Sequence, residues 1–193
     1  MKRALCIDID NVVAQTDLVL REVIRLHSRN GVDLRYEDVV EFDYWLCKDA
    51  GGRCFDKSEW WKIHDEEFTQ NHLLRIRPVD NIMHHLEQLR GRYELHLVTS
   101  RRPEGEAHTR QWIREYGIPH DYLHFSSHRA KHKLPVPFFA AVDDDREQIR
   151  LFHEAGVLGF ILAHPWNKVD VGCSLRRVDD WQQLTAELLK LAA

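Results

Sequence analysis

The stretch Cys6-Ile7-Asp8-Ile9-Asp10-Asn11-Val12 closes a short apolar run with two acidic side chains. Residues 5–9 have the length and the largely apolar character of a strand buried on both faces of a parallel sheet. Open α/β sheets bind ligands beyond the carboxyl ends of their strands, where Asp8 and Asp10 stand. Clustered carboxylates repel each other unless a cation offsets their charge, and a hard divalent ion such as Mg²⁺ suits oxygen ligands. The residues alone leave a second interpretation open, in which the two aspartates cap the following helix.

Three more apolar runs of strand length follow along the chain, at residues 95–99, 138–142 and 157–162. Segments with the apolar spacing of amphipathic helices accompany them, at residues 81–90, 107–116 and 148–154. Strands that alternate with helices in this way predict an α/β fold built on a parallel sheet.

The alternation is interrupted between residues 17 and 78, where we expect no buried strand. Residues 17–28 show helical spacing of apolar side chains, and Gly31 follows just past their end. Six aromatic residues then gather in the next part of this segment: Phe42, Tyr44, Trp45, Phe55, Trp60 and Trp61. We therefore expect a core made of residues 1–16 and 79–193, interrupted by a helical insertion made of residues 17–78.

The composition is typical of a soluble globular protein, with 193 residues of which 44% are hydrophobic and 30% charged. A net charge of −4 argues against a dedicated nucleic-acid binder, which usually presents a basic face. No apolar run approaches the roughly 20 residues of a membrane span, and the N-terminal stretch does not resemble a signal peptide. We expect a cytoplasmic protein with reduced thiols, although Cys47 and Cys54 could cross-link in an oxidising compartment.

Polar residues also stand at the carboxyl ends of two of the later predicted strands. Acidic residues 143–145 follow the third apolar run directly, as Asp8 follows the first. Thr99 and Ser100, with two arginines after them, close the second run, where hydroxyls and backbone N–H groups suit a phosphate. From the residues alone, the hydroxyls could equally cap a turn, and three acidic residues in a row could be a solvated loop.

Taken in this order, the motifs resemble those of the haloacid dehalogenase-like superfamily of phosphotransferases. That superfamily has D-x-D-x-[TV] after its first strand, Thr or Ser closing the second, a lysine, and an acidic pair after a later strand. The matching residues here are Asp8-Ile9-Asp10-Asn11-Val12, Thr99, Lys133 or Lys131, and Asp143-Asp144. The resemblance spans residues 4–162 and implies a three-layer, Rossmann-like parallel sheet. It also implies that residues 17–78 are a small helical cap, inserted after the first strand, which closes over the active site.

The resemblance further implies covalent phosphoryl transfer. Asp8 would be the nucleophile that forms an aspartyl-phosphate, and Asp10 would be the general acid and base. Because dehalogenases of the superfamily lack the second aspartate, the presence of Asp10 disfavours dehalogenation.

A magnesium site and a phosphate site are implied by the same resemblance. Mg²⁺ would bind Asp8, the backbone carbonyl of Asp10, and Asp144, while Asp143 would pair with Lys133. The groups that would hold the phosphoryl oxygens are Thr99, Ser100 and Lys133, with Lys131 as the alternative lysine.

Several features are also similar to the 5′-nucleotidase family that includes the 5′(3′)-deoxyribonucleotidases. They are the small helical cap, the Thr99-Ser100-Arg101 run, the ten-residue spacing from Lys133 to Asp143, and the tail His164-Pro165-Trp166-Asn167. The similarity implies a nucleoside monophosphate as substrate. The aromatic cap residues offer flat faces on which its base could stack: Phe42, Tyr44, Trp45, Trp60 and Trp61, of which Phe42, Trp45 and Trp61 are the candidate substrate contacts. Two residues depart from the pattern, since Asn11 stands where many superfamily members have Gly, and Arg101 where Pro is typical of the animal enzymes.

Other interpretations stay open on the sequence. The aromatic residues of the insertion could form its own small core. The substrate could be a sugar phosphate or the phosphorylated end of a polynucleotide, although the net charge of −4 weighs against a polynucleotide. A chain of this fold could also bind phosphate without turnover, but every motif position carries a residue type that can perform the chemistry.

Overall fold

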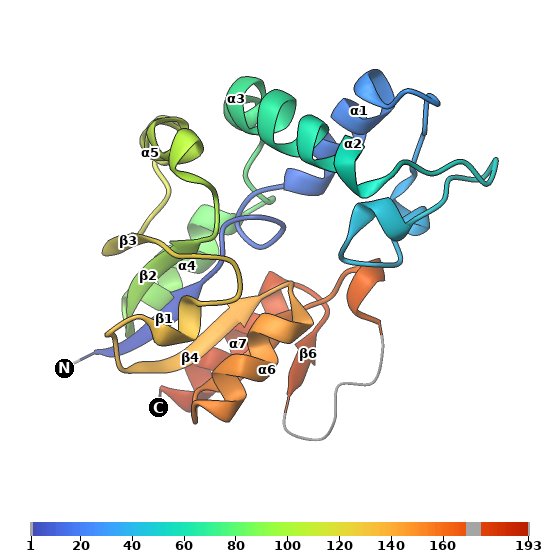
Figure 1. The fold of residues 1–193 in the computed structure, drawn as a ribbon. Helices are drawn as coiled ribbons and strands as arrows, with labels where there is room; N and C mark the ends of the chain where they lie inside the picture. Colours follow the sequence, from blue (N-terminus) through green and yellow to red (C-terminus); the bar gives the residue numbers. More distant parts are fainter. Residues whose placement is uncertain (1, 169–174, 193) are drawn as a thin grey trace.

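The computed structural model of the chain describes residues 2–168 and 175–192, and its centre is a parallel sheet (Figure 1). The sheet has six strands in the order β3-β2-β1-β4-β5-β6. The strands are β1 (Arg3–Ile7), β2 (Tyr93–Thr99), β3 (Tyr122–Phe125), β4 (Phe138–Asp143), β5 (Leu158–Leu162) and β6 (Arg176–Val178). Every neighbouring pair is parallel, so the predicted α/β class is confirmed.

Helices cover both faces of the sheet, which gives the core three layers. Leu5 and Ile7 of β1 belong to a cluster that also holds side chains of α4 (Ile82–Arg90), α5 (Glu106–Tyr116) and α7 (Trp181–Leu191). Ala4 and Cys6 belong to a second cluster with side chains of α6 (Arg146–Glu154). This alternation follows from strand geometry, in which successive side chains point to opposite faces.

Three elements were not predicted from the sequence: β3, β6 and α7. β3 lies at the edge of the sheet and its four residues are exposed or half-buried, so it lacks a buried apolar run. β6 has three residues, of which one is buried. Strands this short carry too little alternation to be recognised.

Residues 17–78, all of which the structure describes, contain helices and turns but no strand. The elements are α1 (Thr16–His27), 3₁₀ turns at Tyr36–Asp38 and Tyr44–Leu46, α2 (Lys57–Trp61), a π-helical stretch at Lys62–Phe68, α3 (Thr69–Asn71) and a 3₁₀ turn at Leu73–Arg75. Figure 1 shows α1, α2 and α3 together, beyond the carboxyl ends of the strands.

The two ends of this segment lie side by side. Ala14 bridges Pro78, the N–H of Gln15 donates to the carbonyl of Arg77 at 2.9 Å, and the N–H of Val79 donates to that of Val13 at 2.8 Å. The chain therefore leaves the first strand and returns toward the second at one place, as an insertion does. Among the described residues, every helix is too short or too polar to cross a membrane.

Candidate active site

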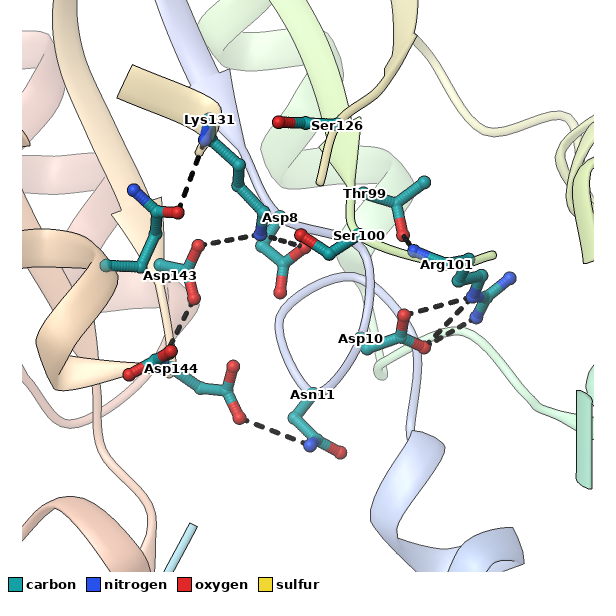
Figure 2. A network of polar contacts seen from close by, with 12 residues as sticks. Asp8, Asp10, Asn11, Thr99, Ser100, Arg101, Ser126, Lys131, Asp143 and Asp144 are labelled. Carbon is teal, nitrogen blue, oxygen red and sulfur yellow. Dashed lines mark hydrogen bonds and ion pairs between the residues drawn. The ribbon is translucent and has the colours of Figure 1, made fainter. Parts of the chain in front are cut away.

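Asp8, Thr99 and Asp143 stand at the carboxyl ends of three neighbouring strands. Asp8 directly follows β1, while Thr99 and Asp143 are the last residues of β2 and β4. Because β1 lies between the other two strands and runs parallel to both, the three side chains lie close together at the carboxyl end of the sheet. All three are buried. Figure 2 shows them in one polar network with Asp10, Lys131 and Asp144.

The ammonium of Lys131 bridges two of these carboxylates. Its Nζ lies 2.6 Å from Oδ1 of Asp8 and 2.8 Å from Oδ2 of Asp143. Lys131 is buried, whereas Lys133, at the other end of the same 3₁₀ turn, is exposed. The predicted pairing of Asp143 with Lys133 is therefore wrong. Side chains two positions apart in a 3₁₀ turn point about 120° apart, so only one of the two lysines can face the carboxylates.

Burial and neighbouring charges shift the pKa values of the side chains in this network. Burial raises the pKa of Asp8 to about 8; Lys131 opposes the shift, and Asp143 and Asp10 reinforce it. Burial also raises the pKa of Asp143 and raises that of Asp144 well above its ordinary value. Burial lowers the pKa of Lys131, but the facing carboxylates of Asp143 and Asp8 outweigh it and raise that pKa. Three buried carboxylates thus share one ammonium, and a further cation would offset the remaining negative charge.

The carboxylates fit a hard divalent cation. One oxygen from each of Asp8, Asp143 and Asp144 lies within 4.8 Å of the other two. Both oxygens of Asp143 are engaged, Oδ2 by Lys131 and Oδ1 by the N–H of Asp145 at 2.9 Å. In contrast, Oδ1 of Asp144 accepts no hydrogen bond from the residues that the structure describes. Since Mg²⁺ prefers carboxylate and carbonyl oxygens, Asp8 and Asp144 are the side chains best placed to hold it.

Asp10, which is half-buried, forms an ion pair with the buried guanidinium of Arg101. Nε of Arg101 lies 3.0 Å from Oδ2 of Asp10, Nη2 lies 2.6 Å from Oδ1, and the hydroxyl of Thr16 donates to Oδ1 at 2.6 Å. Burial favours the neutral acid, but the Arg101 guanidinium outweighs it and holds the pKa of Asp10 below its ordinary value. Arg101, which departs from the nucleotidase pattern at this position, thus contacts the second aspartate.

The two predicted hydroxyl ligands lie in different surroundings. Ser100 lines the cavity above the carboxylates, and its hydroxyl donates to the carbonyl of Ser127 at 3.4 Å. Thr99 is fully buried, and its Oγ1 accepts from the N–H of Arg101 at 3.1 Å. Ser100 is therefore open to a ligand, while Thr99 supports the turn behind it (Figure 2).

A cavity of about 790 Å³ opens above the polar network. Its lining includes Asp8, Asp10, Ser100, Lys131 and Asp144 on one side. On the other side, residues 17–78 contribute all three predicted aromatic wall residues, Phe42, Trp45 and Trp61. The acidic cluster and the aromatic side chains therefore line one cavity of the size that small-molecule sites have.

The aromatic side chains of residues 17–78 divide into a core and a wall. Trp60 is 8% exposed and stacks on Tyr44 at 5.4 Å and on His64 at 5.0 Å between ring centroids. Trp61 is 43% exposed, and the Arg102 guanidinium lies 5.3 Å from its ring centre. Trp60 is thus packed within the segment at the border of the cavity, whereas Trp61 is the more exposed of the two rings.

Asn11 and Trp166 complete the site, and sequence reasoning assigned neither a function. Asn11 has a φ of +58°, a left-handed conformation that favours Gly and that Asn tolerates better than most residues. This explains why Asn can stand where superfamily members have Gly. Its amide and the indole N–H of Trp166 both donate to Oδ2 of Asp144, at 3.2 and 3.1 Å. The only sequence signal was the His164–Asn167 tail, noted for its resemblance alone.

Comparison with protein-family models and with curated proteins finds no match. Solved structures share the fold. A haloacid dehalogenase-like hydrolase from Streptococcus pneumoniae has a TM-score of 0.69 at 14% identity, over 96% of this chain and 98% of that one. A predicted phosphoglycolate phosphatase from Haemophilus somnus has a TM-score of 0.65 at 17% identity, over 100% and 98%. CbbY from Rhodobacter sphaeroides, in complex with xylulose-1,5-bisphosphate, has a TM-score of 0.59 at 16% identity, over 95% and 96%. The chain has the fold of haloacid dehalogenase-like hydrolases.

Proposed function

We propose that this chain is a Mg²⁺-dependent phosphomonoester hydrolase that acts through an aspartyl-phosphate on Asp8. The observation that carries the proposal is the 2.6 Å contact of Asp8 with Lys131, beside Asp143 and Asp144, on the wall of a cavity. A carboxylate that receives a phosphoryl group needs fixed positive charge beside it, and Lys131 supplies part of that charge. The shared fold with haloacid dehalogenase-like hydrolases supports the same class of reaction.

In the proposed first step, Asp8 attacks phosphorus, and the bond between phosphorus and the ester oxygen breaks. Asp10 would give a proton to the departing oxygen and would later take one from the water that hydrolyses the aspartyl-phosphate. Lys131 and Ser100 would stabilise the equatorial phosphoryl oxygens, and Thr99 would support the turn that carries Ser100. Bound Mg²⁺, held by Asp8, Asp144 and the backbone carbonyl of Asp10, would neutralise the charge of the phosphoryl group.

We also propose that residues 17–78 act as a cap and that the substrate is a nucleoside monophosphate. The support is that Phe42, Trp45 and Trp61 line the cavity and are less buried than Trp60, which borders the same cavity. A base has a flat face that would stack on such rings. A sugar phosphate is the rival substrate, because CbbY binds xylulose-1,5-bisphosphate on the same fold.

Phosphate release from nucleoside monophosphates, sugar phosphates and p-nitrophenyl phosphate tests these proposals, in Mg²⁺ and in EDTA. We expect Mg²⁺-dependent release that is fastest with nucleotides and absent in Asp8→Asn. Release from sugar phosphates alone would keep the reaction and reject the nucleotide. Release that survives Asp8→Asn would reject the nucleophile. No release from any compound, with correctly folded protein, would favour a phosphate-binding protein without turnover.

A further inference from the structure

Among the described residues, the side-chain donors to the Asp144 carboxylate all contact one oxygen, Oδ2. Its Oδ2 accepts from the indole N–H of Trp166 at 3.1 Å and from the amide of Asn11 at 3.2 Å. Its backbone carbonyl accepts from the amide of Asn167 at 3.0 Å. The other carboxylate oxygen, Oδ1, receives no hydrogen bond from the described residues. Figure 2 shows the Asn11 amide below Asp144, on the side away from Lys131. These contacts fix the carboxyl group and leave one oxygen free.

Trp166 is itself fixed by its neighbours. The indole stacks on the ring of His164 with centroids 4.4 Å apart and planes within 3° of parallel. Asn167, the next residue, donates to the carbonyl of Leu162 at 2.8 Å as well as to Asp144, which ties this turn to the end of β5. A buried indole has two rotatable side-chain bonds, so stacking on His164 restricts the direction of its N–H.

The loop that carries Asn11 is tied to the same turn. The ring Nε2 of His164 lies 2.8 Å from the carbonyl of Asn11, so this nitrogen carries the proton and donates. The other ring nitrogen, Nδ1, is then an acceptor for the hydroxyl of Tyr36 at 2.9 Å. Tyr36 belongs to residues 17–78. The turn at His164–Asn167 therefore contacts the loop after Asp10, the Asp144 carboxylate and the inserted segment.

We propose that Trp166 is a positioning residue that, together with Asn11, orients the Asp144 carboxylate for the divalent cation. The inference rests on the proposed function, because it takes Asp144 as a metal ligand. Residues that hold a ligating carboxylate by hydrogen bonds contribute to metal affinity although they never touch the ion. This assigns a structural role to the His164–Asn167 tail, namely orienting a metal-binding carboxylate. Its resemblance to the nucleotidases assigned no such role.

Binding of Mn²⁺ to the Trp166→Phe variant tests the proposal without reference to turnover. Mn²⁺ shares the preference of Mg²⁺ for carboxylate oxygens, and its free concentration is measured by electron paramagnetic resonance. Phe keeps an aromatic ring against His164 and removes the indole N–H. We expect the dissociation constant to rise about tenfold. Trp112→Phe is the matched control, because that buried indole donates to the carbonyl of Ile76 at 2.7 Å and not to a carboxylate. Its affinity for Mn²⁺ should equal that of the wild type.

A second variant covers the case in which Trp166→Phe does not fold. Asn11→Gly keeps the left-handed backbone and removes the other donor to Oδ2, and it should weaken Mn²⁺ binding by a similar factor. A dissociation constant within twofold of wild type in the folded variants would overturn the proposal. Failure of the proposed function would look different. The wild-type protein would then bind no Mn²⁺, or Asp144→Asn would bind as much Mn²⁺ as the wild type.

Discussion

The guanidinium of Arg101 donates hydrogen bonds to the carboxylate of Asp10, with Nη2 2.6 Å from Oδ1 and Nε 3.0 Å from Oδ2. Nη1 of the same arginine donates to the hydroxyl of Thr109 at 3.1 Å, which anchors the group to α5. The Arg101 side chain is 5% exposed. This pair favours the ionised form of Asp10 in the free protein, so Asp10 has to gain a proton before it can serve as the acid of the proposed first step.

Arg101→Gln should lower the free energy of unfolding at pH 7 by roughly 2–3 kcal/mol. Breaking a buried pair usually costs about 3–5 kcal/mol, and the partial exposure of Asp10 reduces that cost. Urea unfolding measures the change. Arg110→Gln is the control, since its pair with Glu106 is exposed and should contribute less than about 0.5 kcal/mol.

The effect of Arg101→Gln also has a defined pH dependence. Arg101 lowers the pKa of Asp10 in the folded protein, so the pair stabilises the wild type above the unfolded pKa near 4. This contribution is lost as the pH falls through the lower folded pKa. The stability difference between wild type and variant should therefore shrink below about pH 4. A difference that stays constant to pH 2 would contradict the assignment of the pair.

The raised pKa of Asp8 predicts the opposite pH dependence for metal-free protein. The folded state binds a proton between the unfolded pKa near 4 and the folded pKa of about 8, so stability declines as the pH rises through this window. Asp8→Asn removes that titration. In EDTA, the variant should melt higher than the wild type at pH 8, with a smaller difference at pH 5. Equal melting temperatures at pH 8 would show that the repulsion at Asp8 is negligible.

Substitutions of Lys131 and Lys133 form a matched pair that tests which lysine acts in the phosphate site. Lys131→Gln removes the ammonium that contacts Asp8 and Asp143, and it should lower kcat by at least about 100-fold, as loss of one charge-stabilising donor does. Lys133→Gln changes an exposed side chain and should leave kcat within twofold. Steady-state kinetics on the best substrate of the panel decides between them. A large loss in the Lys133 variant would return that lysine to the site.

Substitutions of Trp61 and Trp60 distinguish contact with the substrate from packing within residues 17–78. Trp61→Ala should raise KM for nucleoside monophosphates about fivefold or more, because stacking on one base contributes about 1–3 kcal/mol, and should leave KM for p-nitrophenyl phosphate nearly unchanged. Trp60→Ala empties the core of the segment and should cost about 3–5 kcal/mol of stability. Equal effects of Trp61→Ala on both substrates would place this ring in the packing of the segment.

The sequence by itself determined the parallel sheet and the place of the acidic residues. The run before Asp8 and the run before Asp143 are apolar over several successive positions, and such runs are a local property of the chain. In a parallel sheet the carboxyl ends of neighbouring strands meet, so the two aspartates had to come together once the strands were recognised. The helical character of residues 17–78 followed equally from local spacing and from the lack of a buried run.

Only the tertiary structure decided which partners these residues have. Lys131 rather than Lys133 reaches Asp8 because a 3₁₀ turn presents one of the two to the sheet. Arg101 meets Asp10 across 91 residues of sequence, and Trp166 meets Asp144 across 22. Periodicity reports which face of its own element a side chain occupies. The distance between two elements is set by how they pack, so contacts between side chains far apart in the chain have no local signal in the sequence.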